Sequence, residues 1–282
     1  MSRDEEVVGV FGGGRMGAGI AHAFASAGRR VVVLELTRAT ALAAQGRIET
    51  TLRRAEELGT LSAPVHVVLE RVRTTTDPAA LREAALVVEA VPEAVDLKAR
   101  VLAAIEDHAP DAWVATNTSS LSIEVLASRL SRPERLVGLH FFNPVPASQL
   151  VEVVVGPRTS EELVHRAQAW VEELGKVAVT VRDSPGFASS RLGVALALEA
   201  VRMVEEGVAS ADDIDAAMTL GYKHPLGPLR TTDLVGLDVR LAIAEHLAGE
   251  LGERFAPPAL LREKVAAGHL GRKSGQGFYT WG

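Results

Sequence analysis

The stretch Glu6-Val-Val-Gly-Val-Phe11, followed at once by Gly12-Gly-Gly-Arg-Met-Gly17, decides the fold of this chain. The first half is a short apolar, β-branched run that is typical of a buried strand. The second half carries the spacing Gly-x-Gly-x-x-Gly, and the residues from Ile20 to Phe24 that follow it have helical spacing. In such a turn the first glycine permits a tight bend, the second lets backbone approach a phosphate, and the third allows close helix packing. The sequence therefore predicts a strand, a phosphate-binding turn and a helix in direct succession.

An acidic residue completes this pattern at the end of the next β-branched run. Glu35 follows Val31-Val-Val-Leu34 and lies eighteen residues after Gly17. A carboxylate at this place in a dinucleotide-binding (Rossmann) domain accepts hydrogen bonds from the ribose hydroxyls of NAD and repels the 2′-phosphate of NADP. Arg38 softens that preference, because an arginine near this position can hold a 2′-phosphate. We therefore expect NAD as the cofactor, held by Gly12, Gly14, Arg15, Met16, Gly17 and Glu35.

Strand-like and helical patterns alternate over roughly the first two-thirds of the chain. Continuous apolar strands that alternate with helices are typical of a parallel sheet covered on both faces. After Ser184-Pro-Gly186 only helical patterns follow. The predicted fold is therefore an α/β Rossmann domain with a doubly wound, mostly parallel sheet at 1–183, followed by a smaller all-α domain at 184–282. Further strands are expected at 67–72, 86–91, 113–116, 136–139 and 150–155, and the main later helices at 45–59, 96–108, 161–174, 188–206, 211–220, 234–251 and 258–267.

Composition excludes several classes of protein. The 282 residues are 47% hydrophobic, which a disordered chain is not. A net charge of −6 and only 4% aromatic residues argue against nucleic-acid binding. The absence of Cys removes disulfides, thiolate metal sites and cysteine nucleophiles, and we expect no metal. The apolar runs are shorter than the roughly 20 residues that cross a bilayer, and the start of the chain is acidic, unlike a signal peptide, so we expect a soluble, cytoplasmic protein.

The chemistry requires a base, because oxidation of a hydroxyl group by NAD releases a proton as well as a hydride. Among eight histidines, His140 ends the predicted strand 136–139, at the carboxyl edge where doubly wound sheets bind ligands. Glu152 lies in the apolar strand 150–155, where an unpaired carboxylate is costly. We expect Glu152 to hold one nitrogen of the His140 ring while the other faces the substrate. A buried ion pair with a purely structural role is the alternative that this pattern leaves open.

Ten motifs follow one another along the whole chain. They are Gly12–Gly17, Val88–Glu93, Thr116–Leu121, Gly138–Pro146, Leu150–Glu152, Ser184–Phe187, Glu206–Ser210, Asp212–Asp215, His224–Pro228 and Gly271–Tyr279. In this order they resemble the L-3-hydroxyacyl-CoA dehydrogenase family, above all its short bacterial 3-hydroxybutyryl-CoA members. The resemblance implies a Rossmann domain, a helical C-terminal domain that forms a homodimer, and reversible NAD-linked oxidation of the (S)-3-hydroxyl group of an acyl thioester.

The resemblance also implies roles for individual residues. The catalytic His and Glu of the family fall on His140 and Glu152, and its active-site Ser, which hydrogen-bonds the reacting oxygen, falls on Ser119. Asn117 follows the same predicted strand as Ser119, and we count it among the cofactor contacts; turn and cap formation is the alternative for both. The family's contacts with the nicotinamide and its ribose fall on Glu93, Lys98, Ser119, Asn143 and Lys273.

Three departures from the family pattern lie on the side of the acyl thioester. Ser190 stands where the family has an Asn that bonds the substrate and helps to position the His, so we place Ser190 in the catalytic and substrate sites. The segment Ala147-Ser-Gln149 lacks a cation that is usual there. The predicted second helix lacks the usual Lys for the CoA phosphate; Arg53 and Arg54 are expected to replace it, and Thr51 matches the neighbouring hydroxyl position. These changes suggest an altered acyl group or carrier, such as an acyl-carrier-protein thioester, with 3-hydroxybutyryl-CoA as the favoured substrate.

Other functions remain open at this stage. A β-hydroxyacid dehydrogenase of the 6-phosphogluconate type would need a lysine base, and no Lys lies between Lys98 and Lys176. A sugar-acid dehydrogenase of the λ-crystallin type is closer, although His224–Pro228 favours the acyl-CoA branch. A catalytically weak dinucleotide-binding protein is the non-enzyme alternative, made possible by Ser190. The expected partners are an acyl-CoA or acyl-carrier thioester and a second copy of the chain, without nucleic acid or membrane.

Overall fold

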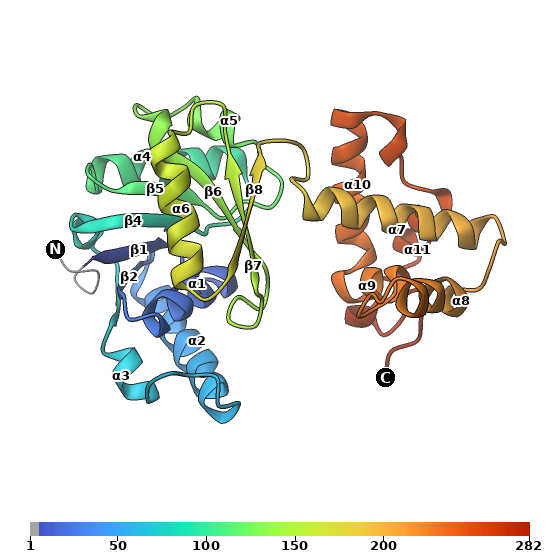
Figure 1. Cartoon of the computed structure of the whole chain (residues 1–282), viewed down its shortest axis with the longest axis horizontal. Helices are drawn as coiled ribbons and strands as arrows, with labels where there is room; N and C mark the ends of the chain where they lie inside the picture. Colours follow the sequence, from blue (N-terminus) through green and yellow to red (C-terminus); the bar gives the residue numbers. More distant parts are fainter. Residues whose placement is uncertain (1–5) are drawn as a thin grey trace. The chain divides into compact units, whose positions relative to one another are not determined.

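The chain divides into two units, each with its own hydrophobic core (Figure 1). The computed structural model describes residues 6–282. The first unit is Met1–Ser184 and the second is Pro185–Gly282. The expected division between residues 183 and 184 lies one residue before this boundary.

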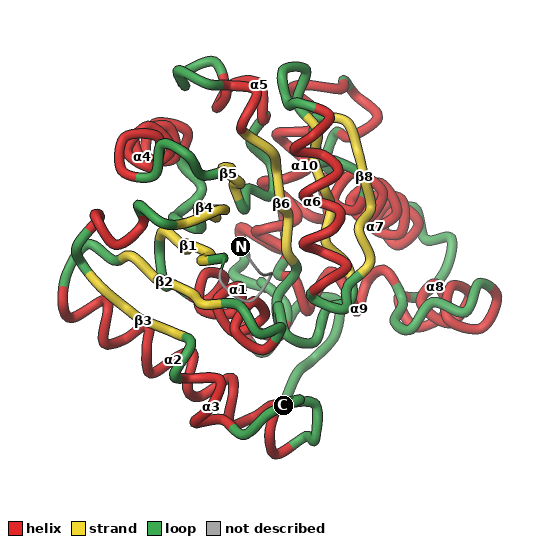
Figure 2. The backbone as a smooth tube through the Cα atoms, turned by 60° about the vertical axis from the view of Figure 1, so that its left-hand side comes forward, coloured by secondary structure: helices red, strands yellow, loops and turns green. Residues whose placement is uncertain are grey.

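The first unit is built on one eight-stranded sheet, with the strand order β3-β2-β1-β4-β5-β6-β7-β8 (Figure 2). Neighbouring strands are parallel from β3 to β6, whereas β7 is antiparallel to β6, and β8 is parallel to β7. The order reverses at β1, which lies between β2 and β4, and such switch points are where doubly wound sheets bind ligands. The predicted mostly parallel sheet is confirmed. The strands are β1 (Val7–Phe11), β2 (Arg30–Leu34), β3 (Val72–Thr75), β4 (Ala84–Glu89), β5 (Trp113–Thr116), β6 (Leu136–Phe141), β7 (Leu150–Val155) and β8 (Val177–Arg182).

Helices cover both faces of this sheet. Val137 and Leu139 of β6 pack in one core cluster with Phe24 of α1 and Trp170 of α6. Side chains alternate along a strand, so the even-numbered residues of β6 face the opposite layer. A Cβ built on Gly138 would indeed meet Ile123 of α5. The helices of this unit are α1 (Arg15–Ser26), α2 (Arg38–Glu57), α3 (Val65–Leu69), α4 (Val95–His108), α5 (Ile123–Ala127) and α6 (Glu161–Glu173).

Two predictions for the first unit were wrong. The apolar run 67–72 is not a strand, because α3 begins after Pro64 and β3 begins only at Val72. Val65 and Val68 are buried one helical turn apart, and a short apolar run does not distinguish a helix from a strand. The edge strand β8 was missed, although its run Val177-Ala-Val-Thr-Val181 is β-branched; it pairs with β7 at the edge of the sheet, where Val177 and Val179 are partly exposed.

The second unit is helical, as predicted. Val194 and Leu198 of α7, Leu229 of α9 and Leu247 of α10 form its buried core. Gly236, with φ +106°, separates α9 from α10, so the helix expected at 234–251 begins at Leu237. No helix among residues 6–282 is long and apolar enough to cross a membrane. The helices are α7 (Ser189–Glu205), α8 (Ala211–Ala216), α9 (Pro228–Val235), α10 (Leu237–Leu251) and α11 (Ala259–Ala266).

Candidate active site

The glycine turn between β1 and α1 has the geometry that its sequence predicts. Gly12 has φ +97°, which favours glycine, and a Cβ on Gly17 would overlap the carbonyl oxygen of Gly12. A Cβ on Gly14, in contrast, would meet no described atom within 4 Å. Gly14 is also the N-cap residue of α1 and provides no side-chain cap, so the first amides of α1 remain available to an anion. The turn therefore fits the pyrophosphate of a dinucleotide. Arg15 beside it is exposed, whereas Met16 packs against the core.

Glu35 lies beside this turn. Its Oε1 accepts a hydrogen bond of 2.6 Å from the backbone N–H of Gly13, and its Oε2 accepts one of 3.3 Å from Leu36. Each carboxylate oxygen has a second lone pair, so Glu35 can still accept from ribose hydroxyls. Arg38 is exposed at the start of α2. These positions match the arrangement expected for NAD.

His140 and Glu152 are direct neighbours in the sheet. They are opposite partners in the antiparallel pair of β6 and β7, and His140 Nδ1 lies 2.7 Å from Glu152 Oε2. Both residues are buried, at 5% and 1% exposure. The ring of Phe142 packs against the His140 ring with their centres 4.4 Å apart. The structure thus brings together the two residues that the sequence proposed as an acid–base pair, at the carboxyl edge of β6.

Ser119 lies in a turn that follows β5 and is organised by Glu93. Glu93 Oε1 accepts hydrogen bonds from the backbone N–H groups of Ser119 (2.8 Å) and Ser120 (3.0 Å) and from the hydroxyl of Thr118 (2.6 Å). Burial opposes the ionisation of Glu93, but these bonds and the charge of Lys98 outweigh it and lower the pKa of the carboxyl. A carboxylate at Glu93 therefore fixes the turn, and Ser119 is left exposed at the carboxyl edge.

Lys98, predicted as a cofactor contact, lies beneath this turn and is fully buried. Its Nζ donates to both carboxylate oxygens of Glu89, at 2.8 and 2.9 Å, and to the carbonyl of Val91. Glu93 Oε2 is 3.4 Å away. The ammonium group therefore has internal partners, and a direct contact with the cofactor stays a prediction. Glu89 was not predicted as a functional residue, although a carboxylate at the end of an apolar strand is a signal in the sequence.

The two predicted asparagines differ in their surroundings. Asn117 is buried, and its Oδ1 accepts a hydrogen bond of 3.0 Å from the N–H of Phe141. This bond joins the end of β5 to the residue that follows His140. Asn143 is exposed just beyond β6, where the peptide bond to Pro144 is cis. Asn117 thus aligns the sheet edge, whereas Asn143 is accessible to a bound cofactor.

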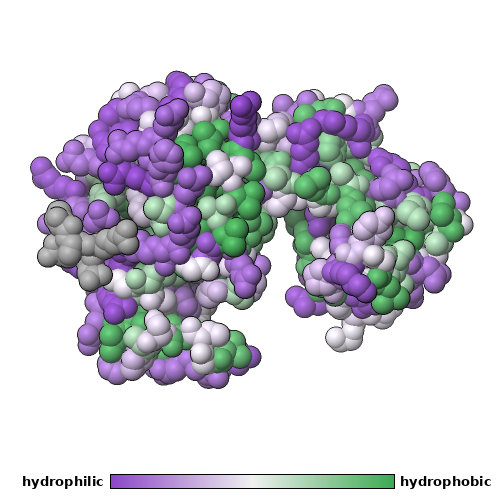
Figure 3. Space-filling model, viewed as in Figure 1, coloured by the Kyte–Doolittle hydropathy of each residue, from purple (hydrophilic) through white to green (hydrophobic). Residues whose placement is uncertain are grey.

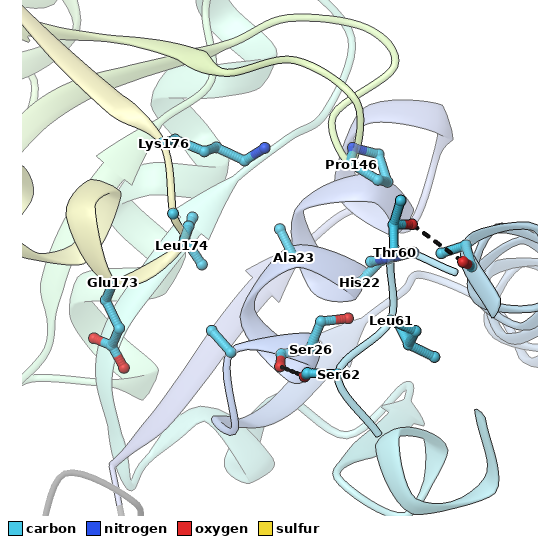
Figure 4. Close-up of a pocket in the computed structure, with 13 residues that line it drawn as sticks. His22, Ala23, Ser26, Thr60, Leu61, Ser62, Pro146, Glu173, Leu174 and Lys176 are labelled. Carbon is cyan, nitrogen blue, oxygen red and sulfur yellow. Dashed lines mark hydrogen bonds between the residues drawn. The ribbon is translucent and has the colours of Figure 1, made fainter. Parts of the chain in front are cut away.

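The connection from β6 to β7 is held in place by Lys176. Its Nζ donates to the carbonyls of Val145 (2.7 Å) and Ser148 (2.6 Å). Lys176 and His22 line a cavity of about 330 Å³. Both residues are labelled in Figure 4. Burial and the charge of Lys176 lower the pKa of His22 to about 4, so this ring is neutral at pH 7. Its Nδ1 lies 3.0 Å from the Thr51 hydroxyl, and His22 therefore has a packing role.

The side of α2 that faces α1 carries a groove of about 550 Å³. Thr51 lines this groove, as the sequence predicts for a substrate contact, whereas Arg53 and Arg54 do not. Those two arginines are exposed and pair with carboxylates of their own helix. Arg47, which the sequence analysis missed, lies one helical turn before Thr51 and on the same helix face. The groove residues are Arg15, Ala18, Ala43, Gly46, Arg47, Thr50 and Thr51.

Ser190 and Lys273 belong to the second unit. Ser190 is the second residue of α7 and is half-buried. Lys273 Nζ lies 2.6 Å from the carboxylate of Asp238, and this hydrogen bond is the main cause that lowers the pKa of Asp238. The roles of Ser190 toward the substrate and of Lys273 toward the cofactor stay predictions. Residues 6–282 contain no group of three or more His, Asp or Glu arranged to hold a metal ion.

Comparisons with known proteins identify the family of this chain. Residues 7–184 match the family model of the 3-hydroxyacyl-CoA dehydrogenase NAD binding domain, and residues 186–281 match that of the C-terminal domain. A probable 3-hydroxybutyryl-CoA dehydrogenase of Deinococcus radiodurans is 42% identical over 97% of this chain and 99% of its own. A 3-hydroxybutyryl-CoA dehydrogenase of Mycobacterium tuberculosis is also 42% identical, over the whole of both chains. The crystal structure of (S)-3-hydroxybutyryl-CoA dehydrogenase from Ralstonia eutropha is 39% identical, covers 98% of this chain and 99% of its own, and has a TM-score of 0.94.

Proposed function

This chain belongs to the 3-hydroxyacyl-CoA dehydrogenase family, and on that premise we propose that it interconverts (S)-3-hydroxybutyryl-CoA and acetoacetyl-CoA. The observation that carries the proposal is the contact between His140 and Glu152 across β6 and β7. A buried His–carboxylate pair at the carboxyl edge of a dinucleotide-binding sheet suits removal of a proton from a hydroxyl group. NAD supplies the acceptor for the hydride when it is bound.

His140 acts as the general base in this proposal. Glu152 holds Nδ1 of the ring, so Nε2 is the nitrogen that we assign to take the proton of the 3-hydroxyl group. The carboxylate also stabilises the imidazolium that forms. In the reverse direction the imidazolium returns this proton to the oxygen at C3. Positioned acid–base catalysis of this kind contributes roughly 10²- to 10⁴-fold to the rate.

Ser119 and Ser190 orient the reacting oxygen. The turn that Glu93 holds presents the hydroxyl of Ser119 at the carboxyl edge, where it bonds the oxygen at C3. We also assign to Ser190 a hydrogen bond to the substrate. Its side chain is shorter than the Asn for which it stands, so a water molecule completes this contact.

The cofactor is NAD rather than NADP. The glycine turn and α1 hold the pyrophosphate, and Glu35 accepts from the adenosine ribose hydroxyls. Asn143 and Lys273 contribute on the nicotinamide side, as do Glu93 and Lys98. A 2′-phosphate beside the carboxylate of Glu35 would be repelled, which sets the preference.

Arg47 holds the phosphates of CoA at the groove between α1 and α2, together with Arg15, which was expected to contact NAD. Both cations line this groove together with Thr51. This assignment replaces Arg53 and Arg54, because neither of them lines the groove. A groove that offers two arginines suits the charged end of CoA, so CoA is favoured over an acyl carrier protein.

The protein forms a homodimer through its second unit. Several of its large apolar side chains are exposed: Leu192 at 70%, Leu220 at 73% and Tyr222 at 76%. Figure 3 shows hydrophobic side chains on the visible surface of this unit. Such side chains are costly in water unless another surface covers them, and a second copy of the chain is the partner that we propose.

We place the enzyme in the cytoplasm, which fractionation of the cells that produce it would test.

One assay tests the reaction. The purified protein is mixed with NADH and acetoacetyl-CoA, and the absorbance of NADH is followed. Parallel assays replace acetoacetyl-CoA by 3-oxoacyl-CoA thioesters of other chain lengths or by acetoacetyl acyl carrier protein, and NADH by NADPH. We expect turnover with NADH and highest kcat/KM for acetoacetyl-CoA. A higher kcat/KM for the carrier-protein thioester than for acetoacetyl-CoA would identify the carrier-protein thioester as the substrate. Binding of NADH without turnover of any thioester would support a dinucleotide-binding protein instead.

A further inference from the structure

Glu89 is a buried carboxylate to which the proposed reaction gives no role. It ends β4, is 0% exposed, and lies against the 0%-exposed side chain of Lys98 from α4. Removing both charges from water costs several kcal/mol for each ion, so such a pair is rarely justified by stability alone. The position of Glu89 at the carboxyl edge of the sheet suggests a reason connected with the active site.

Each oxygen of the Glu89 carboxylate accepts two hydrogen bonds. Its Oε1 accepts a hydrogen bond of 2.6 Å from the N–H of Val91, and its Oε2 accepts one of 2.6 Å from the hydroxyl of Thr116. Lys98 Nζ donates to both oxygens. Glu89 therefore fixes the first residues after β4, the last residue of β5 and the ammonium group at the same time.

Two paths lead from Glu89 to the proposed active site. The first runs from Lys98 to Glu93, 3.4 Å away, and from Glu93 to the backbone N–H of Ser119. The second runs through the backbone, because the Glu89 carbonyl accepts from the N–H of Asn117 at 2.8 Å. Asn117 in turn accepts from the residue that follows His140.

We propose that Glu89 is a positioning residue for Ser119. Its carboxylate takes up the charge of Lys98, so that Glu93 stays directed at the N–H groups of the Ser119 turn. Without the Glu89 charge, Glu93 is the remaining carboxylate beside Lys98, and the attraction between them draws Glu93 away from that turn. Ser119 then no longer presents its hydroxyl to the oxygen at C3. This inference rests on the role of Ser119 in the proposed function.

A double-mutant cycle on kcat separates positioning from general support of the fold. The variants are Glu89→Gln, Ser119→Ala and the two combined, each assayed with acetoacetyl-CoA and NADH and normalised to the NADH-binding sites counted by titration. We expect each single variant to lower kcat about tenfold, and the double variant to lie within about twofold of Ser119→Ala, because interacting residues are not additive. Losses that multiply, or an unchanged kcat in Glu89→Gln, would overturn the inference.

Controls keep the outcome decisive. Glu83→Gln removes an exposed carboxylate from the same strand region and should leave kcat unchanged. If Glu89→Gln does not fold, Glu89→Asp, which draws the carboxylate back from Lys98, takes its place in the cycle, with the same criterion of non-additivity and a smaller loss. An inactive wild-type protein would instead refute the proposed function, whereas an active wild type with multiplying losses would refute the role of Glu89 alone.

Discussion

Two buried acid–base pairs lie at the carboxyl edge of one sheet, and they differ in what burial does for them. His140 and Glu152 face each other across β6 and β7, while Glu89 of β4 meets Lys98 of α4. The first pair contains an imidazole, the group that most often acts as a general acid or base in enzymes. The second joins a carboxylate to an ammonium group, and the proposed reaction gives this pair no proton to transfer. We therefore propose that similar burial serves chemistry in one pair and the placement of neighbouring groups in the other.

Removing the imidazole should have the largest effect. His140→Ala deletes the proposed base, and we expect kcat to fall roughly 10²- to 10⁴-fold while the affinity for NADH changes little. Stopped-flow turnover and fluorescence titration of NADH would measure the two quantities. His165→Ala, at a helical position of the first unit, is the matched control. Near-normal turnover in His140→Ala would show that His140 is not the base, so that neither pair takes part in the chemistry.

Breaking the pair of Lys98 and Glu89 should lower the free energy of unfolding. Lys98→Met leaves Glu89 without its ammonium partner, and breaking a buried pair on one side costs about 3–5 kcal/mol in the free energy of unfolding. Denaturant unfolding would measure this loss. The combined variant Lys98→Met with Glu89→Leu should recover part of it, because no uncompensated charge remains buried. If Lys98→Met unfolds like the wild type, the pair does not hold the sheet edge.

Glu35 lies outside both pairs and should affect cofactor choice. Glu35→Ala removes the acceptor for the ribose hydroxyls and the repulsion of a 2′-phosphate, so we expect NADH to lose about tenfold in affinity, worth about 1.4 kcal/mol, and NADPH to lose less. Binding of the two reduced cofactors would be titrated for each variant. Equal losses for NADH and NADPH would show that Glu35 does not discriminate between them.

The smallest effect is expected at the groove between α1 and α2. Arg47→Ala should raise KM for acetoacetyl-CoA severalfold with little change in kcat, because it removes a binding contact remote from the reacting carbon. The KM for a thioester truncated before the CoA phosphates should not change. Arg53→Ala, the variant that the sequence pattern suggests, should change KM less than Arg47→Ala. The reverse order would restore the sequence-based assignment.

Local patterns predicted the parts of the site that neighbours along the chain determine. The roles of Gly12 and Gly17 follow from the turn between β1 and α1, and the structure bears out their geometry. The contact between His140 and Glu152 was also anticipated, because a polar residue in an apolar strand requires a partner. Helix α3 was mistaken for a strand because its short apolar run has no distinguishing period.

Contacts between residues of different helices and strands were harder to predict from the sequence. Arg47 was missed, although it lies one helical turn from Thr51, because which face of α2 lines the groove depends on α1. Lys98 was predicted as a cofactor contact, and its burial against Glu89 depends on the packing of α4 over β4.

By itself, the sequence determined the class of the fold, the place of the glycine turn and the pairing of His140 with Glu152. Those features depend on local backbone requirements and on the period of apolar residues, both of which are written along the chain. The tertiary structure alone decided that Glu89, Lys98 and Glu93 form one network beneath Ser119. The physical reason is that a buried charge takes its partners from whichever elements the packing brings within hydrogen-bond distance, and the chain order does not specify that distance.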